Sequence, residues 1–249
     1  MNTSARDPEP LAGKSALVVG VGGLGCPAAL ALARAGIGRL ALADDDVVDV
    51  TNLHRQILFS DEDVGHDKLT AAAAALRRAG YQGHVDLVRS RLLPENARAL
   101  ASSVDVVAEG ADNFATKFLV ADACRLEGRP VVHGSAVRFR ATVWAIGAGG
   151  RPCYRCLFED VPFGEAQTNC AEAGVMGPVA GLAGALMADL ALRVVTGDAC
   201  FGLVHTYDGL TDRLRSVEVA PRRDCPLCGE ARSIFDIDET RYTGAVCAA

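Results

Sequence analysis

The chain has 249 residues, half of them hydrophobic, so its length suits one large α/β domain and its composition supports a large buried core. Its formal net charge of −6 disfavours nucleic acid or an anionic membrane surface as the main partner. The N-terminal stretch lacks the pattern of a signal peptide, and Gly, Pro, Arg or Asp interrupt the longest apolar stretches, 24–35 and 175–195, so we expect a cytoplasmic protein with no membrane span.

After a lead-in over residues 1–13, which we expect to be flexible, short apolar segments alternate with segments rich in alanine and leucine. The pattern predicts strands at 15–20, 39–43, 85–88, 104–108 and 130–133, and helices at 24–35, 68–79 and 114–126. Strands that alternate with helices of this length indicate a parallel sheet covered on both faces. In such sheets the ligand lies beyond the carboxyl ends of the strands.

The pattern changes at about residue 138. Antiparallel strands are expected at 141–146 and within 201–219, with a cysteine-bearing crossover loop at 151–174 and a helix at 175–195. The predicted fold class is therefore α/β, a doubly wound, Rossmann-like mixed sheet with antiparallel C-terminal strands and a crossover loop. One half of the domain would span 14–136 and the other 137–249.

A glycine-rich segment, GVGGLG, follows the first expected strand and opens a helix. Glycines at such a turn let backbone N–H groups approach a phosphate, and the helix N-terminus adds partial positive charge. Asp44, at the end of the second strand, stands where an acidic residue binds ribose hydroxyls. This pattern alone indicates a nucleotide, and an NAD-dependent oxidoreductase fits it equally well.

Polar residues beyond the second strand favour a triphosphate instead. The segment from Asp44 to Gln56, DDDVVDVTNLHRQ, contains Arg55, and Lys68 begins the next helix. Such cations offset charge that builds up at phosphorus, and a nicotinamide enzyme has no need of them. Asp112, with Asn113 beside it, adds a carboxylate suited to Mg²⁺ after a later strand.

Four of the nine cysteines form two CxxC pairs, Cys153 with Cys156 and Cys225 with Cys228. Without an export signal, such pairs point to metal and not to a disulfide framework. Four thiolates fill the tetrahedral coordination of Zn²⁺, so the predicted site is structural.

These motifs resemble the MoeB/ThiF/HesA family of ubiquitin-activating-like adenylyltransferases over nearly the whole chain. The resemblance is carried by GVGGLG, by DxDxVxxxNLxRQ, by Gly65 with Lys68, by Asp112-Asn113, and by CYRC, NCAEAGVMGP and CPLC. It implies that Mg·ATP is held by Gly20, Gly22, Gly23, Gly25, Asp44, Thr51, Asn52, Leu53, His54, Arg55, Gln56, Lys68, Asp112 and Asn113.

The resemblance also implies a structural zinc on the four CxxC cysteines, an ATP-binding half at 14–136 and a carrier-binding half at 137–249. The expected reaction is adenylation of the C-terminal glycine of a ubiquitin-like sulfur-carrier protein that ends in Gly-Gly, for molybdopterin or thiamine synthesis. A homodimer and a sulfurtransferase are further expected partners.

Cys170 matches a family position that in some members forms a covalent link to the carrier, and its neighbours suggest an exposed loop. Two features depart from the family. Many family members begin with a longer N-terminal helix that carries an arginine, whereas here only Arg6 precedes the first strand. Arg140-Ala141-Thr142 stands where the family sequence has Glu-Gly-Gln. An NAD-dependent oxidoreductase and a non-catalytic carrier-binding relative therefore stay open as alternatives.

Overall fold

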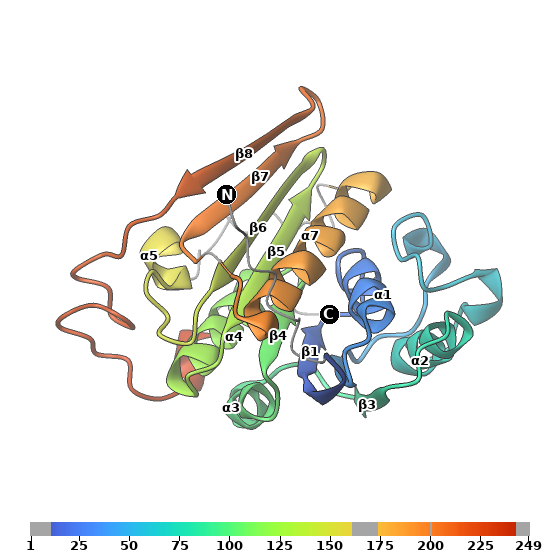
Figure 1. Ribbon diagram of the computed structural model, residues 1–249, viewed down its shortest axis with the longest axis horizontal. Helices are drawn as coiled ribbons and strands as arrows, with labels where there is room; N and C mark the ends of the chain where they lie inside the picture. The colour runs from blue at the N-terminus through green and yellow to red at the C-terminus, as the bar shows by residue number, and fades with distance from the viewer. Residues whose placement is uncertain (1–10, 161–173, 200, 243–249) are drawn as a thin grey trace, which may run out of the picture.

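The structure, a computed structural model, describes residues 11–160, 174–199 and 201–242. Its centre is an eight-stranded sheet in the order β3-β2-β1-β4-β5-β6-β7-β8 (Figure 1). The strands are β1 Ser15–Val19, β2 Arg39–Ala43, β3 His84–Val88, β4 Val106–Glu109, β5 Val131–Val137, β6 Arg140–Ile146, β7 Leu203–Asp208 and β8 Arg213–Glu218.

The first five strands are parallel, and β5 to β8 are antiparallel. The chain moves outward from β1 to β2 and β3, then returns to the other side of β1 to form β4. This reversal of strand order between β1 and β4 is where an open α/β sheet binds its ligand. The predicted doubly wound, mixed α/β fold is confirmed.

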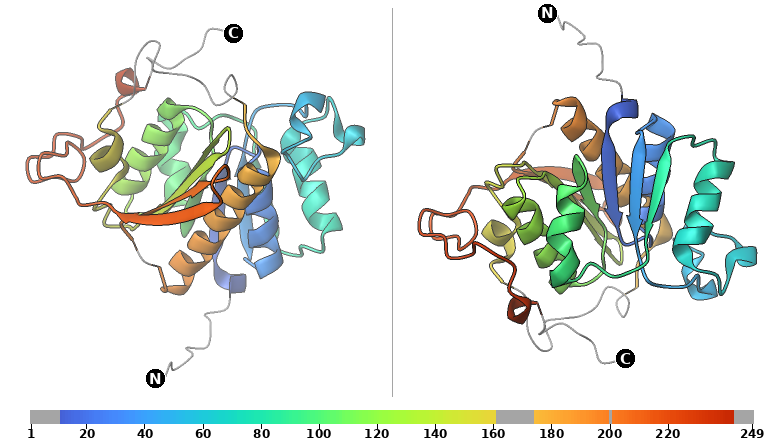
Figure 2. Two further views of the ribbon diagram at one scale, coloured as in Figure 1. Left: turned by 90° about the horizontal axis from the view of Figure 1, so that it is seen from above. Right: turned by 90° about the horizontal axis from the view of Figure 1, so that it is seen from below.

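Helices cover both faces of the sheet (Figure 2). One face carries α1 Gly25–Ala35, α2 Lys68–Arg78 and α7 Gly177–Thr196, and the other carries α3 Pro94–Ser102, α4 Phe114–Leu126 and α5 Tyr154–Phe158. Alternate strand residues enter the two cores: in β1, Ala16 and Val18 pack under α1 and α7, whereas Leu17 and Val19 pack under α3 and α4.

Helix α7 is long and apolar enough to span a membrane by length and composition alone. However, half of its apolar window is buried, and it packs on β5, β6 and α1. Its small residues make this close packing possible: a Cβ on Gly184 would lie 2.3 Å from the Leu24 carbonyl oxygen. It is thus a core helix of the α/β domain.

Most expected elements lie within a few residues of their predicted bounds. The structure corrects three details. The stretch 201–219 is two strands, β7 and β8, joined by a turn, and helices α3 and α5 were not predicted. At the start of the described chain, Leu11–Gly13 forms a 3-10 helix that accepts the Gly38 N–H.

Candidate functional site

The glycine loop that joins β1 to α1 is the first part of the candidate site. Gly20 has a φ of 80°, a conformation that suits glycine. A Cβ on Gly25 would lie 1.9 Å from the Gly20 carbonyl oxygen, so only glycine fits at the start of α1. The backbone N–H groups of Gly22 and Gly23 have no acceptor in the part of the chain that the structure describes. They are available to an anionic ligand at the N-terminus of α1.

Asp44 links the end of β2 to this loop. Its Oδ2 accepts the Val21 N–H at 2.7 Å, and its Oδ1 accepts the Asp46 N–H at 2.9 Å. The carboxylate is therefore fixed beside the glycine loop, at the position where a ribose is bound in nucleotide-binding sheets.

Lys68, the first residue of α2, is brought to the same place. Its ammonium group lies 2.8 Å from Asp46 Oδ2 and 3.9 Å from Asp44 Oδ1, and the residue is only 4% exposed. Asp67 caps α2 by accepting the Thr70 N–H, which fixes where the helix begins. The capped helix thus presents a buried cation at the end of β2.

Arg55 and Gln56 lie against the glycine loop. A Cβ on Gly23 would lie 3.3 Å from the aliphatic stem of Arg55, whose guanidinium donates to Asn52 Oδ1 at 2.5 Å. Gln56 is 3% exposed, and its Oε1 has no hydrogen-bond partner in the described chain. A buried acceptor without a partner is uncommon and indicates a place where a ligand or ordered solvent bonds.

Three more of the predicted ATP-binding residues contact other parts of the protein. Thr51 bonds Asp49, His54 Nδ1 lies 2.9 Å from the Thr51 carbonyl oxygen, and Leu53 packs on the apolar core. Their contact with a nucleotide stays a prediction.

Asp112 and Asn113 follow β4 and have different roles. Asp112 is exposed and makes no hydrogen bond or salt bridge with any described residue, so its carboxylate is available to a divalent cation. Asn113 instead caps α4 by accepting the Thr116 N–H at 2.9 Å, so its oxygen is already engaged.

Arg91, which follows β3, was not predicted as a site residue. Its Nε donates to Asp45 Oδ2 at 2.8 Å. Its pKa is raised, first by this bond and further by the charges of Asp46 and Asp112. Arg91 therefore faces the same cluster of carboxylates as Lys68. Its place just beyond the end of a strand is the signal that points to it.

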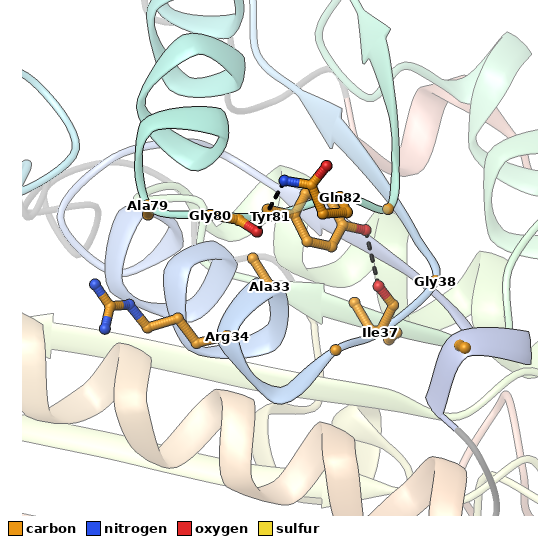
Figure 3. A pocket seen from close by; sticks show the side chains of 11 residues that line it. Ala33, Arg34, Ile37, Gly38, Ala79, Gly80, Tyr81 and Gln82 are labelled. Carbon is orange, nitrogen blue, oxygen red and sulfur yellow. Dashed lines mark hydrogen bonds between the residues drawn. The ribbon is translucent and has the colours of Figure 1, made fainter.

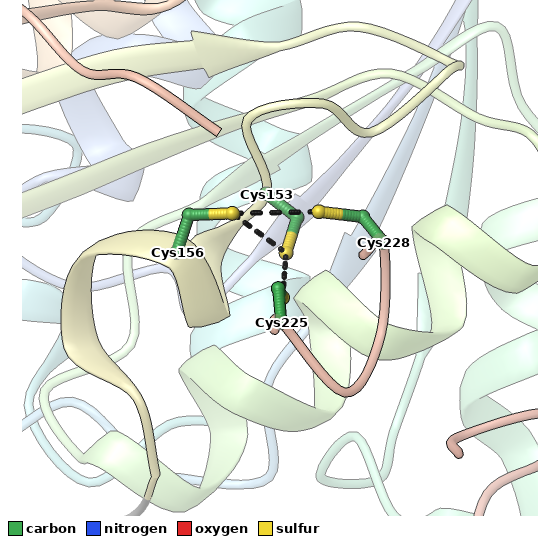
Figure 4. A group of neighbouring side chains, drawn as sticks. All are labelled: Cys153, Cys156, Cys225 and Cys228. Carbon is green, nitrogen blue, oxygen red and sulfur yellow. Dashed lines mark hydrogen bonds between the residues drawn. The ribbon is translucent and has the colours of Figure 1, made fainter. Parts of the chain in front are cut away.

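The four CxxC thiols lie together as predicted (Figure 4). The Sγ atoms are 3.4 Å apart in the pairs Cys153–Cys225 and Cys156–Cys228 and 3.9 Å apart in Cys153–Cys156, and all four residues are buried. Four sulfurs bound tetrahedrally at about 2.3 Å from Zn²⁺ would be about 3.8 Å apart. The donor set and its size therefore fit a closed zinc site.

A cavity of about 590 Å³ lies at the opposite edge of the sheet (Figure 3). It is lined by turns that precede β2 and β3, including Gly38 and Gly83. This cavity lies at the amino ends of the strands, so it has no part in the candidate site.

The remaining predicted site residue, Cys170, lies outside the described residues. Cys26, on the first turn of α1, is buried, and burial raises the pKa of its thiol to about 12. Cys26 is therefore protonated at neutral pH and unsuited to act as a nucleophile.

Two curated relatives cover most of this chain. Adenylyltransferase and sulfurtransferase MOCS3 of Sus scrofa is 43% identical over 232 residues, which are 92% of this chain and 51% of the relative. SAMP-activating enzyme E1 of Haloferax volcanii is 39% identical over 226 residues, 89% of this chain and 83% of the relative. The chain thus spans about half the length of its MOCS3 relatives.

Solved structures share the fold. The crystal structure of E. coli MccB with AMPCPP and MccA has a TM-score of 0.78 at 22% identity, covering 89% of this chain and 68% of that one. The model of the ThiF family matches residues 3–227. With this match and the Haloferax relative, the chain belongs to the ThiF family.

Proposed function

We propose that the protein is an ATP-dependent adenylyltransferase. The observation that carries this proposal is the placement of Lys68, through Asp44, and of Arg55 beside a glycine loop in which the Gly22 and Gly23 N–H groups have no acceptor among the described residues. Cations beside such a loop suit a triphosphate, because charge builds up at phosphorus in the transition state. The names of the MOCS3 relatives support the same activity.

The proposed reaction is attack of a C-terminal glycine carboxylate on the α-phosphorus of ATP. Pyrophosphate leaves, and an acyl-adenylate remains. A carboxylate is already a nucleophile at neutral pH, so the protein contributes positioning and charge stabilisation. Arg55 and Lys68 hold the phosphates and Asp44 the ribose. Asp112 would hold Mg²⁺, which would supply further neutralisation of phosphate charge.

The proposed substrate is a ubiquitin-like sulfur-carrier protein that ends in Gly-Gly, with a sulfurtransferase supplying sulfur to the adenylate. The relative named as an activating enzyme E1 supports a protein substrate. Molybdopterin and thiamine synthesis are the proposed pathways, and the cytoplasm is the proposed location. We propose a homodimer in which α7, with Leu182 36% exposed, contributes to the interface.

Pyrophosphate exchange tests the proposal. With a Gly-Gly-ending carrier, the purified protein should incorporate labelled pyrophosphate into ATP in a reaction that requires the carrier's terminal glycine. Tight NAD binding without ATP binding would instead support an oxidoreductase. Carrier binding without exchange would support a non-catalytic relative.

A further inference from the structure

A charged cluster lies beneath the loop that bears Asp112, and the proposed mechanism does not use it. Glu109, the last residue of β4, is fully buried, and its Oε1 accepts the Ala111 N–H at 2.6 Å. Its Oε2 accepts hydrogen bonds from Lys117 Nζ at 2.9 Å and from His133 Nδ1 at 3.0 Å. One carboxylate thus joins β4, α4 and β5 to the loop.

The cluster is balanced in charge. Burial opposes ionisation of Glu109, but Lys117 and His133 outweigh it and lower the pKa of the carboxyl group. Burial lowers the pKa of His133, so its ring is neutral at physiological pH and donates through Nδ1–H. The ring is held on its other side by Tyr154, with ring centroids 4.5 Å apart. One anion, Glu109, and one cation, Lys117, remain, and they form a buried ion pair in which their charges cancel.

The loop held in this way touches the glycine loop directly. A Cβ on Gly110 would lie 3.5 Å from the Gly25 nitrogen, and a Cβ on Gly20 would lie 3.4 Å from the Ala111 nitrogen. Lys117 also donates to the Gly134 carbonyl oxygen at 2.6 Å, which ties the same cation to β5. The position of residues 110–112 is therefore fixed by the hydrogen bond to Glu109 and by packing against the glycine loop.

We propose that Glu109, Lys117 and His133 are positioning residues that fix the 110–112 loop and so place Asp112 for the metal–nucleotide complex. This inference rests on the proposed function. The cluster does not touch the nucleotide, and it acts through the Ala111 N–H. Its loss should weaken Mg·ATP binding and raise the Mg²⁺ requirement without removing any group that contacts the ligand.

The test is isothermal titration of the full-length protein with Mg·ATP, and with Mg²⁺ at saturating ATP. In Glu109→Gln the amide NH2 group must face donors, either the Ala111 N–H or those of Lys117 and His133, so we expect Mg·ATP affinity to fall at least about tenfold and the half-saturating Mg²⁺ concentration to rise. A second variant, Glu109→Leu/Lys117→Met, removes both buried charges and keeps a similar volume, so we expect it to fold. It should show the same losses with a near-normal melting temperature.

The matched control is Asp105→Asn. Asp105 precedes β4 at its other end and accepts the Ser15 N–H at 2.8 Å, far from the site. This variant should bind Mg·ATP like the wild type.

Wild-type affinity in both folded Glu109 variants would overturn the inference and leave the proposed function intact. Absence of Mg·ATP binding by the wild type would refute both. Rapid exchange of the Ala111 amide in the wild type would overturn the inference even if neither variant folds.

Discussion

Lys68 differs from an ordinary surface lysine because its ammonium group is held before any ligand arrives. Two carboxylates, Asp44 and Asp46, lie within 3.9 Å of it, and almost no side-chain surface is exposed. A buried cation in fixed geometry needs little reorganisation to meet a phosphate. Arg55 is similarly restrained by Asn52 and by the backbone of Gly23.

The first prediction concerns these two cations. Lys68→Ala and Arg55→Ala should each lower carrier-dependent pyrophosphate exchange by at least ~100-fold, because each removes one charge partner of the transition state. Steady-state exchange assays measure this, with Arg78→Ala, an exposed position at the end of α2, as the control. Near-normal exchange in both variants would contradict the assigned roles.

The second prediction concerns Cys170, for which we propose a bystander role. Cys170→Ala should still form the adenylate and should still support thiocarboxylate production, because attack on phosphorus needs no thiol. Mass spectrometry of the wild-type protein with carrier, ATP and a sulfur donor provides the measurement. A carrier conjugate mapped to Cys170 would show that this residue is a covalent relay.

Among single residues, the site residues that belong to sequence motifs could be predicted from the sequence. Residues whose role depends on buried contacts with distant parts of the chain could not. Asp44, Lys68 and the four clustered cysteines lie where their spacing suggested. Glu109 and His133 gave no signal because a single charged residue in an apolar segment looks the same whether it faces solvent or a buried partner. Only the fold brings Lys117 to them.

Helix α2 carries Lys68 on its first turn, so the position of the cation depends on where the helix begins. Asp67 sets that point by accepting hydrogen bonds from the Thr70 hydroxyl group and from the Thr70 N–H, which lower the pKa of its carboxyl group. Because the folded pKa lies below the unfolded value, the charged cap stabilises the fold above the unfolded pKa. That contribution disappears as the pH falls through the folded pKa.

The third prediction follows from this cap. Asp67→Ala should lower the free energy of unfolding by about 1 kcal/mol at neutral pH, and the difference from wild type should shrink below about pH 4. Urea unfolding at several pH values measures both effects. Glu62→Ala, a nearby exposed acid, is the control and should change stability little. If wild type and Asp67→Ala differed in free energy of unfolding as much at pH 3 as at neutral pH, the electrostatic explanation of the cap would be contradicted.

Helices and strands were located correctly from the sequence where a long apolar pattern marked them. Helix α3 was missed because it is short and mostly polar: only Ala97 and Ala101 of its nine residues are buried, so few apolar side chains mark it. Helix α5 is a five-residue segment that begins directly after Cys153 and contains Cys156. The strands expected within 201–219 were left without separate bounds because β8 is an edge strand with every residue exposed, so no burial pattern marked where it begins.

For the molecule as a whole, the fourth prediction concerns metal. The purified protein should contain about one zinc per chain, and Cys153→Ser or Cys228→Ser should lower both zinc content and melting temperature, because metal binding contributes to folding free energy. Elemental analysis and calorimetry measure these quantities. Cys124→Ala, a buried cysteine outside the cluster, should retain its zinc. A metal-free protein of unchanged stability would refute the four-cysteine site.

The clustered cysteines also change the topology of the chain. Residues 153 and 225 lie 72 positions apart, and α7, β7 and β8 all lie between them. A bound ion would turn this stretch into a closed ring, and closing a ring of that size restricts the unfolded chain by about 4 kcal/mol in the loop-entropy model. One cut of the backbone inside the ring would leave a single linked molecule, which would separate into two pieces only after both unfolding and loss of the ion.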